Sequence, residues 1–338
     1  MTAEADAVAG LLGRAYGIAP VALRLLRATP ETIVYRADSA GHPPRLVRIG
    51  GATTTLDAYA ADAATLLLLE QRCYPAPRVV RAVDGAVVLT HEGRPVLVTT
   101  FVTGEPLQAT PTSLQALGQT LGRLHALRLP PTSGNLLPLP PARMLPASEL
   151  AFAGAELEAV RSITPTELAP RFAVLEAACH DRNGYTELPS VLIHNDCHPG
   201  NSVRTDTGEV VLIDWEGAGL GSAILDLGFL LMSCAIPVPV GWADGTVALP
   251  WQPPPQPAGH LEAVIAGYCR QRLLAPAELD RLVEAMRFRA LVAAARAFAA
   301  QVNRHLRDDP CPWWWARYEA ALALANQASV TFHRYRPC

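Results

Sequence analysis

Two neighbouring segments of the chain concentrate side chains that ionise, bind metals or form hydrogen bonds. Residues 191–203 read VLIHNDCHPGNSV, and after a short turn residues 209–217 read EVVLIDWEG. The combined pattern is H-x-D-x-x-x-x-N followed by a return and an apolar strand that ends in an acid. Two short strands of this kind would bring Asp196, Asn201 and Asp214 to the same end.

This set of groups is the one that phosphoryl transfer requires. A carboxylate such as Asp196 can accept or orient the proton of an attacking hydroxyl, while Asn201 and Asp214 can hold Mg²⁺ against nucleotide phosphates. Protein kinases have the same spacing between the catalytic Asp and the magnesium-binding Asn. The pattern therefore predicts a catalytic loop over 191–203 and a metal-binding strand end over 210–217.

Two other interpretations of the loop stay open on these residues alone. His194, Cys197 and His198 are ligand types that zinc prefers, but no fourth ligand stands at motif spacing and there is no C-x-x-C pair. A polar loop can also be purely structural, with its side chains capping its own backbone.

Composition sets the broad class. Half of the 338 residues are apolar, and a formal net charge of -3 gives no basic surface for nucleic acid or acidic membranes. Prolines and an acid interrupt the longest apolar runs, so no membrane span is predicted. The opening MTAEADAVAG has no positive stretch, which argues against a secretory signal, and seven singly scattered cysteines favour reduced thiols. We expect a cytoplasmic protein.

The first hundred residues are rich in short strands. Four β-branched runs are separated by Gly, Pro and Asp turn signals: 31–38, 45–49, 86–92 and 95–102. The Ala- and Leu-rich stretch 55–72 between the second and third runs is typical of a helix. Consecutive strands joined by turns favour an antiparallel sheet.

Helices and Pro-rich connectors dominate after about Gly104. Thr112 and Gln115 form a candidate capping box for a helix over 113–127, and residues 275–306 read as a long Ala-rich helical region. The predicted fold class is α+β.

Its organisation would be a small antiparallel-sheet lobe with one main helix, residues 1–103, followed by a larger, mainly helical lobe, residues 104–338. The first lobe would bind the nucleotide. The second would carry the catalytic loop, the metal-binding strand end and the substrate-binding helices.

The motifs resemble the aminoglycoside phosphotransferase family of small-molecule kinases. HNDCHPGN, IDWEGAGLG and ILDLGFLL carry the resemblance, together with CYPAPRVV, FVTGEPL and LGRLHAL, over roughly residues 30–230. The family form is H-G-D-x-H-x-x-N, so Asn195 stands where glycine is usual. The resemblance implies a protein-kinase-like two-lobe fold, with Asp196 as the catalytic base and with Asn201 and Asp214 as Mg²⁺ ligands. The implied phosphate donor is ATP or GTP.

The first lobe departs from the kinase pattern at its phosphate-binding cation. Kinases use a lysine on the third strand, paired with a helix Glu. All 28 basic residues of this chain are arginine, and Arg48 in RLVRIG occupies that place, with Asp62 on the following helix as its expected partner. Arginine can bind phosphate bidentately, so the substitution is chemically sound. The alternative is that Arg48 is a solvated strand residue.

Two further nucleotide contacts follow from position in the chain. The loop expected to cover the nucleotide, 27–36, contains no glycine, and Thr29 and Thr32 would offer hydroxyls there. The nucleobase would meet the backbone of the linker between the lobes, from Phe101 to Thr103.

The substrate must be read from the last hundred residues. From residue 240 onward there are eight acids against eleven arginines, whereas a polycationic aminoglycoside would favour an acid-rich pocket. Two Trp-rich stretches, 240–260 and 308–320, would suit a bulky, partly apolar alcohol such as a macrolide, nucleoside or peptide antibiotic. The alternative is that WWW packs a helix onto the core, and an aminoglycoside stays a candidate.

The function expected from the sequence is a magnesium-dependent small-molecule O-phosphotransferase. It would move the γ-phosphate of ATP or GTP to a substrate hydroxyl, with antibiotic resistance or self-protection as the context. A metabolite kinase unrelated to resistance and a nucleotide-binding pseudokinase are the alternatives; Arg48 and the glycine-free loop favour the latter. A protein kinase is disfavoured, because G-x-G-x-x-G, D-F-G and A-P-E are missing.

Overall fold

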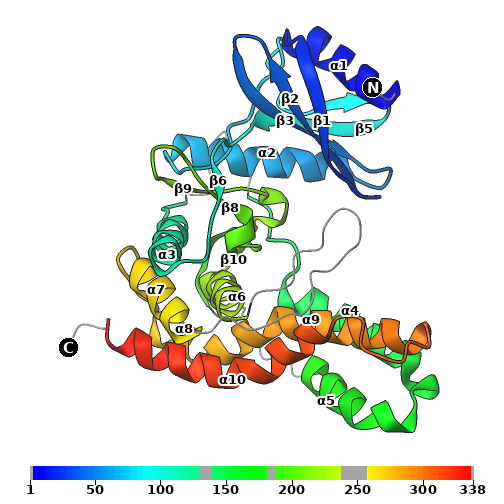
Figure 1. Cartoon of the computed structure of the whole chain (residues 1–338), viewed down its shortest axis with the longest axis vertical. Helices are drawn as coiled ribbons and strands as arrows, with labels where there is room; N and C mark the ends of the chain where they lie inside the picture. The colour runs from blue at the N-terminus through cyan, green and yellow to red at the C-terminus, as the bar shows by residue number, and fades with distance from the viewer. Residues whose placement is uncertain (1–2, 130–138, 181–187, 237–256, 336–338) are drawn as a thin grey trace. The chain divides into compact units, whose positions relative to one another are not determined.

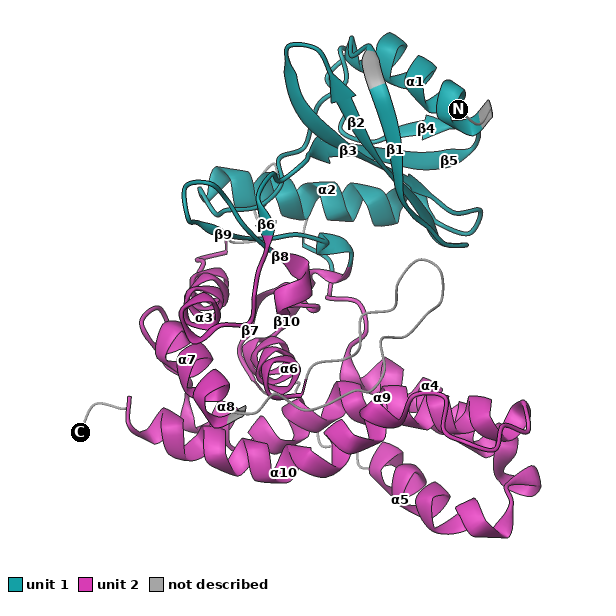
Figure 2. Cartoon of the chain, in the orientation of Figure 1, with its two compact units in different colours: residues 1–105, 130–140, 203–216 teal, residues 106–129, 141–202, 217–338 magenta. Residues whose placement is uncertain are grey.

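The chain forms two compact units (Figure 2). Unit 1 comprises residues 1–105, 130–140 and 203–216, and unit 2 comprises residues 106–129, 141–202 and 217–338. The computed structural model describes residues 3–129, 139–180, 188–236 and 257–335. No helix in these ranges is long and apolar enough to cross a membrane.

Unit 1 is built on a five-stranded antiparallel sheet in the order β1–β2–β3–β5–β4, with two helices (Figure 1). The strands are β1 (Pro20–Ala28), β2 (Thr32–Ser39), β3 (His42–Gly50), β4 (Leu89–His91) and β5 (Arg94–Thr100). The helices are α1 (Ala3–Tyr16) and α2 (Leu56–Gln71). The four predicted strands and the predicted helix are all present, and α1 and β1 extend the expected set.

One face of this sheet packs against a core, and the other face lines a cavity. Neighbouring strand residues point to opposite faces, so β3 sends Val47 and Ile49 into a core cluster shared with α1. Leu46 and Arg48 point to the other face, where they line a cavity together with residues of α2. Helix α1 and helix α2 lie on opposite sides of the sheet (Figure 1). The period-2 alternation thus separates a packing face from a cavity face.

Helix α2 begins at an N-cap that its sequence favours. The Thr55 hydroxyl accepts a hydrogen bond from the Ala58 N–H at 3.2 Å, and Asp57 lies in the first turn, where a negative charge complements the helix dipole. This start fixes the position of Asp62, which lies one and a half turns further along and is buried.

A small sheet in the order β6–β8–β9 carries the chain toward Asp214. Its strands are β6 (Glu105–Pro106), β8 (Ser202–Arg204) and β9 (Val210–Leu212). The return between β8 and β9 is closed by the Thr205 N–H, which donates to the Glu209 carbonyl at 2.9 Å, and by Gly208 at φ +82°. Glycine suits this left-handed conformation.

In its described residues, unit 2 is mainly helical and contains one antiparallel strand pair. The strands are β7 (Ser190–Ile193) and β10 (Gly219–Ser222). The helices are α3 (Pro111–His125), α4 (Pro146–Val160), α5 (Ala169–His180), α6 (Ala223–Ala235), α7 (Pro257–Cys269), α8 (Pro276–Leu279), α9 (Leu282–Asn303) and α10 (Pro312–His333). The described residues also form the short 3₁₀ turns η1 (Arg161–Ile163), η2 (Thr166–Leu168) and η3 (Pro199–Asn201) in this unit, and η4 (Trp215–Gly217), which begins in unit 1 and ends in unit 2.

The main core of unit 2 gathers apolar residues of α4, α5, α6 and α9. Leu157, Leu175 and Phe298 are almost fully buried at its centre. Trp314 and Trp315 of α10 pack against this cluster, and Trp315 stacks on Tyr318. The structure therefore shows the alternative considered from the sequence: the WWW segment packs a helix onto the core.

Helix α3 begins two residues earlier than predicted. The N-cap is Thr110, whose hydroxyl accepts the Ser113 N–H at 3.3 Å, and Pro111 occupies the first helical turn. The Thr112 cap predicted from the sequence is wrong, because proline favours the first helical position and moves the cap upstream. The helical region 275–306 forms two helices, α8 and α9.

Close contact between α3 and α7 depends on glycine. A Cβ at Gly118 would lie 2.2 Å from the Val264 carbonyl oxygen, and one at Gly267 would lie 1.9 Å from the Gln115 carbonyl oxygen. No side chain fits at either distance.

The predicted fold class, α+β with an antiparallel N-terminal sheet and a helical C-terminal region, is confirmed.

Candidate active site

The loop after β7 is anchored by a buried carboxylate, Asp226 of α6. Its Oδ2 accepts the backbone N–H of His194 at 2.7 Å, and its Oδ1 accepts that of Asn195 at 3.0 Å. Asp226 is 1% exposed. Burial opposes its charge, but the hydrogen bonds from His125 and from the N–H of His194 bring the pKa of Asp226 below its usual value. The loop is therefore tied down at the two residues before Asp196.

A chain of buried hydrogen bonds supports this anchor from behind. His125 Nε2 lies 3.2 Å from Asp226 Oδ2, and His125 Nδ1 lies 2.9 Å from the Tyr268 hydroxyl. Arg272 donates to the same hydroxyl at 3.1 Å and pairs with Glu278 at 2.8 Å. Burial lowers the pKa of His125, so we assign it as neutral, donating to Asp226 and accepting from Tyr268. His125 is thus a core histidine with a hydrogen-bond partner at each ring nitrogen.

Asp196 and Asn201 are held against each other. The Asn201 side-chain N–H₂ donates to Asp196 Oδ2 at 2.7 Å and to the Asp196 carbonyl at 3.1 Å. Both bonds use the amide nitrogen, so the amide oxygen of Asn201 is the atom that can face a cation. The Asp196 side chain is 36% exposed, and His198 Nε2 lies 3.9 Å from its Oδ2. The carboxylate is therefore oriented and still open to solvent.

Asn195 occupies a backbone conformation that explains its residue type. Its φ is +67°, in the left-handed region that glycine and then asparagine tolerate best. Its side-chain amide donates to the carbonyls of Arg143 and Gly217, the latter at 3.2 Å. Asparagine therefore keeps the turn that glycine makes in the family motif and adds two bonds to it.

Arg289 of α9 is a site residue that the sequence did not reveal. Its guanidinium donates to the carbonyl of Asn195 and, at 2.9 Å, to Asn195 Oδ1, and it lies over the Phe229 ring at 5.2 Å. The negative charge of Asp196 acts on it, although burial lowers the pKa of Arg289 overall. No motif marks this residue, because tertiary packing alone brings α9 to the loop.

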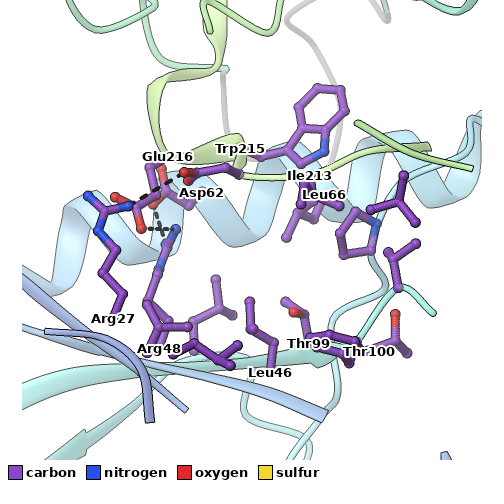
Figure 3. Close-up of a pocket in the computed structure, with 18 residues that line it drawn as sticks. Arg27, Leu46, Arg48, Asp62, Leu66, Thr99, Thr100, Ile213, Trp215 and Glu216 are labelled. Carbon is purple, nitrogen blue, oxygen red and sulfur yellow. Dashed lines mark hydrogen bonds and ion pairs between the residues drawn. The ribbon is translucent and has the colours of Figure 1, made fainter. Parts of the chain in front are cut away.

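Unit 1 contains a cavity of about 290 Å³ on the face of its sheet to which Leu46 and Arg48 point (Figure 3). This volume approaches the lower end of ligand pockets, roughly 300–1,000 Å³. Its lining residues come from β1, β2, β3, α2, β5, the segment after β5 and the stretch 203–216: Leu26, Arg27, Val34, Leu46, Arg48, Asp62, Leu66, Pro77, Leu97, Thr99, Thr100, Phe101, Val102, Val203, Ile213, Asp214, Trp215 and Glu216. Apolar side chains form one part of the wall, and the charged ones gather at one end (Figure 3).

Arg48 lies at the charged end and pairs with two acids. Its guanidinium donates to Asp62, and its Nη1 lies 3.4 Å from Glu216 Oε1. The guanidinium carbon also lies 4.4 Å from the centre of the Tyr59 ring. Burial opposes the charge, but Asp62 and Glu216 outweigh it and raise the pKa of Arg48. The pair expected on this strand and helix is present, with Glu216 as an addition.

Asp214 follows β9 in a left-handed conformation, with φ +63°. This conformation suits an aspartate better than most residues. Its carboxylate lines the cavity, and Arg27 Nη1 lies 3.6 Å from Asp214 Oδ2. The next residue, Trp215, is buried edge-on against Tyr74 and donates its indole N–H to the Leu212 carbonyl at 2.9 Å. Trp215 thus fixes the chain on one side of Asp214.

The segment after β5 offers backbone groups at the cavity edge. The Phe101 N–H donates to the Pro44 carbonyl at 3.0 Å, and Phe101 and Val102 line the cavity. No bond within the described ranges uses the N–H of Val102 or Thr103. Thr103 is exposed and outside the lining.

Thr32 is also outside the cavity lining. It is 3% exposed, and its hydroxyl donates to the Ile49 carbonyl at 3.3 Å. Its N–H donates to the Thr29 hydroxyl at 3.2 Å, and the Thr29 N–H donates to the Thr32 carbonyl at 2.9 Å. Both threonines therefore satisfy the turn between β1 and β2 with their polar groups.

The donors near these sites fit a hard cation better than zinc. Asp214 of unit 1 offers carboxylate oxygens and Asn201 of unit 2 an amide oxygen, and both are donor types that Mg²⁺ prefers. Across the described ranges, no three or more His, Cys, Asp or Glu side chains cluster as a metal site. Burial raises the pKa of the Cys197 thiol well above its usual value, which disfavours a thiolate ligand.

The two Trp-rich stretches differ in what is known of them. Most of 240–260 lies outside the described residues. In 308–320, Asp309 pairs with Arg171 at 2.5 Å, and the Arg171 guanidinium lies over Trp315 at 4.6 Å. An arginine therefore already neutralises Asp309.

The antiparallel sheet with its cavity, together with the Asp196–Asn201 loop of the helical unit, defines the class of kinase-like phosphotransferases. The chain belongs to the phosphotransferase enzyme family (APH), whose sequence profile matches residues 31–250. This match confirms the family resemblance drawn from the motifs.

The proteins similar to this chain are named for several different substrates. The homoserine kinase of Hyphomonas neptunium is 30% identical over 226 residues, which are 63% of this chain and 62% of the kinase, so the chain spans less than two thirds of that relative. An amicoumacin kinase in complex with AMP-PNP and Ca²⁺ has a similar structure, with TM-score 0.65 at 16% identity over 99% of this chain and 100% of the other.

Two further solved structures show the same fold. A spectinomycin phosphotransferase in complex with ADP and spectinomycin has TM-score 0.62 at 14% identity, covering 96% of this chain and 98% of the other. A choline/ethanolamine kinase family protein from Mesorhizobium loti has TM-score 0.58 at 17% identity, covering 98% and 99%. At these identities the likeness concerns the fold.

Proposed function

We propose that the protein is a magnesium-dependent O-phosphotransferase that moves the γ-phosphate of a nucleoside triphosphate to the hydroxyl of a small molecule. The observation that carries the proposal is the 2.7 Å hydrogen bond from Asn201 to the Asp196 carboxylate. This one bond orients the Asp196 carboxylate, and it leaves the Asn201 amide oxygen as the atom that can face a metal ion. Family membership supports the reaction class.

Asp196 is the base of this proposal. Its carboxylate accepts the proton of the substrate hydroxyl as the oxygen attacks phosphorus. Asp226 and Arg289 hold the loop on either side of Asn195, so the carboxylate needs little reorganisation when substrate arrives. His198, 3.9 Å away, is the nearby group that can share the proton.

Asn201 and Asp214 are the proposed magnesium ligands, and Arg48 is the proposed phosphate-binding cation. Magnesium would neutralise charge on the phosphates and orient them. The base of the nucleotide would lie against the apolar wall of the cavity, with its edge near the backbone of Val102 and Thr103. ATP is the proposed donor over GTP, since the amicoumacin and spectinomycin enzymes were solved with adenine nucleotides.

The acceptor we propose to test first is a small amino alcohol. The relative at 30% identity is a homoserine kinase, whereas the antibiotic kinases share 14–16% identity with this chain. In the described part of the C-terminal region, the Trp cluster packs against the core, which weakens the argument for a bulky apolar acceptor. Antibiotics form the second test set.

The experiment measures nucleotide binding first and transfer second. Binding of ATP and GTP is followed by calorimetry with and without Mg²⁺, and [γ-³²P]ATP transfer is then screened over homoserine, choline, other amino alcohols and hydroxylated antibiotics. Magnesium-dependent binding with transfer to one class supports the proposal. Binding without transfer to any alcohol would favour the pseudokinase alternative, and no nucleotide binding would overturn both.

Removal of the Asp214 carboxylate should show up in metal-dependent binding. Asp214→Ala is expected to weaken ATP binding in the presence of Mg²⁺ by at least ~10–100-fold, the range seen when a metal site loses a supporting group. Without Mg²⁺ the variant should bind ATP at least as well as wild type, because it lacks one negative charge. Asp206→Ala, at an exposed position of the same unit, is the control. Equal magnesium dependence of the variant and wild type would remove Asp214 from the site.

Arg48 tests whether arginine has replaced the kinase lysine. Arg48→Ala is expected to lower turnover by about 100-fold, as loss of one preorganised charge does in other sites. Arg48→Lys should retain more activity, and adding Asp62→Glu should recover part of the deficit by extending the acid toward the shorter cation. A double-mutant cycle gives the coupling energy. Turnover of Arg48→Ala equal to that of wild type would show that the cation has no catalytic role.

A further inference from the structure

Arg27 is a second cation in the cavity of unit 1, and no motif marks it. It is the next-to-last residue of β1, and its guanidinium points toward the acidic side chains at the charged end (Figure 3). Its Nη1 lies 3.6 Å from Asp214 Oδ2. Arg27 therefore lies beside the proposed metal ligand.

A bulge in β1 accounts for the direction of this side chain. The pairing of β1 with β2 shifts register between Leu25, opposite Tyr35, and Arg27, opposite Val34. In a regular strand, consecutive residues point to opposite faces, yet Leu26 and Arg27 both line the cavity. Bulges often redirect one side chain next to a site. This bulge places an extra positive charge on the cavity face.

The two cations of the cavity differ in how firmly they are held. Arg48 is 8% exposed and lies between the carboxylates of Asp62 and Glu216, which together more than balance its charge. The Arg27 side chain is 48% exposed, and its pair with Asp214 is at 3.6 Å. Exposed pairs of this kind contribute little to stability, so Arg27 can exchange one anion for another at little cost.

The cavity lining also has a charge imbalance that a metal–nucleotide complex would change. Its charged residues are two cations and three acids: Arg27, Arg48, Asp62, Asp214 and Glu216. A divalent cation on Asp214 would repel Arg27 from that carboxylate. The phosphate oxygens brought by the same complex would offer the guanidinium a bidentate partner.

The turn after β1 leaves a role for such a side chain. Kinases cover the phosphates with backbone N–H groups of a glycine-rich loop. Here the N–H groups of Thr29 and Thr32 are bonded within the turn, and the Glu31 carbonyl accepts the Gly51 N–H at 2.6 Å. The N–H groups of Thr29 and Thr32 are thus committed to the fold, and Pro30 between them has no N–H to offer.

We propose that Arg27 binds the β- and γ-phosphates of the donor nucleotide, replacing with a guanidinium the contacts that a glycine-rich loop would make. The inference rests on the proposed function, because it assumes that the cavity binds a nucleoside triphosphate. In the absence of nucleotide, Arg27 pairs with Asp214. In its presence, Asp214 turns to magnesium and Arg27 to phosphate.

The test compares ligands that share the nucleoside and differ in phosphates. Binding of adenosine, ADP and the non-hydrolysable triphosphate AMP-PNP is measured by calorimetry in Mg²⁺, on wild type, Arg27→Met, Arg27→Lys and the control Arg24→Met. Arg24 lies on the same strand, is exposed and does not line the cavity. Its replacement removes the same charge without the proposed contact, so it isolates the local effect from the field of the whole unit.

Arg27→Met is expected to weaken AMP-PNP binding by about 10- to 100-fold, the loss that removal of a charge-assisted hydrogen bond produces. Adenosine binding should change by less than twofold, Arg27→Lys should be intermediate, and Arg24→Met should match wild type. Unchanged AMP-PNP binding by Arg27→Met, or an equal loss for adenosine, would overturn the role of Arg27 and leave the proposed function standing. A wild-type protein that binds neither ligand would overturn the proposed function and this inference with it.

Discussion

Replacing Asp196 with asparagine is expected to lower turnover by at least about 100-fold, the lower end of what a positioned general base contributes. The change removes the proton acceptor and preserves the shape of the side chain. The amide oxygen can still accept the hydrogen bond that Asn201 donates at 2.7 Å, so the loop should keep its geometry. Affinity for the magnesium–nucleotide complex should therefore stay within a few-fold of wild type.

Steady-state kinetics and calorimetry on the same preparation check this prediction. Asp280→Asn, the same substitution at an exposed position of unit 2, is the matched control and should leave turnover unchanged. Near wild-type turnover of Asp196→Asn would show that the proton leaves by another route. A parallel loss of nucleotide affinity would instead point to a structural role for Asp196.

The largest effect on stability is expected at Asp226. Asp226→Ala removes the acceptor of two backbone N–H groups and the partner of His125, all of them buried. Three buried donors would lose their acceptor, each at a cost of about 1–3 kcal/mol, so the free energy of unfolding should fall by at least about 3 kcal/mol. Urea unfolding followed by circular dichroism measures the change, and Asp280→Ala serves as the exposed control. A loss below 1 kcal/mol would mean that water replaces the carboxylate.

The same network predicts how stability depends on pH. The pKa of His125 is lowered from 6.5 in the folded protein, so below that value the unfolded chain binds a proton that the folded chain does not. The pKa of Asp226 is lowered from 3.8, which works in the same direction at more acidic pH. Stability should therefore fall as the solution is acidified below pH 6.5, with a second decline below pH 3.8. The second decline should be weaker in Asp226→Ala.

Strand patterns in the sequence predicted most of the unit 1 sheet. The β-branched runs 31–38 and 45–49 correspond to β2 and β3, because alternating residues there serve a packing face and a cavity face. Strand β1 escaped prediction, since VALRLLRA alternates neither in polarity nor in β-branching. Its strand conformation comes from pairing with β2, a tertiary contact that local sequence does not encode.

The site could be predicted only where its residues form a motif. The spacing of Asp196, Asn201 and Asp214 indicated phosphoryl transfer. The role of each of these residues stays a prediction. Arg27 and Arg289 could not be found in this way. A register shift in β1 directs the first, and the packing of α9 brings the second to a loop 94 residues away in sequence. Both depend on three-dimensional contacts that leave no local pattern.

The arginine at position 48 also affects how the protein can be detected. A reagent that acylates amines could tag the strand lysine of a kinase, but this chain contains no lysine at all. A lysine amine begins to lose its proton near its pKa of about 10.4, whereas a guanidinium stays charged at every pH at which proteins remain folded. Amine-directed labelling would thus find no target side chain in the cavity. A survey of kinases based on such labels would miss this protein, and guanidinium-directed or photo-crosslinking nucleotides would be needed to reveal it.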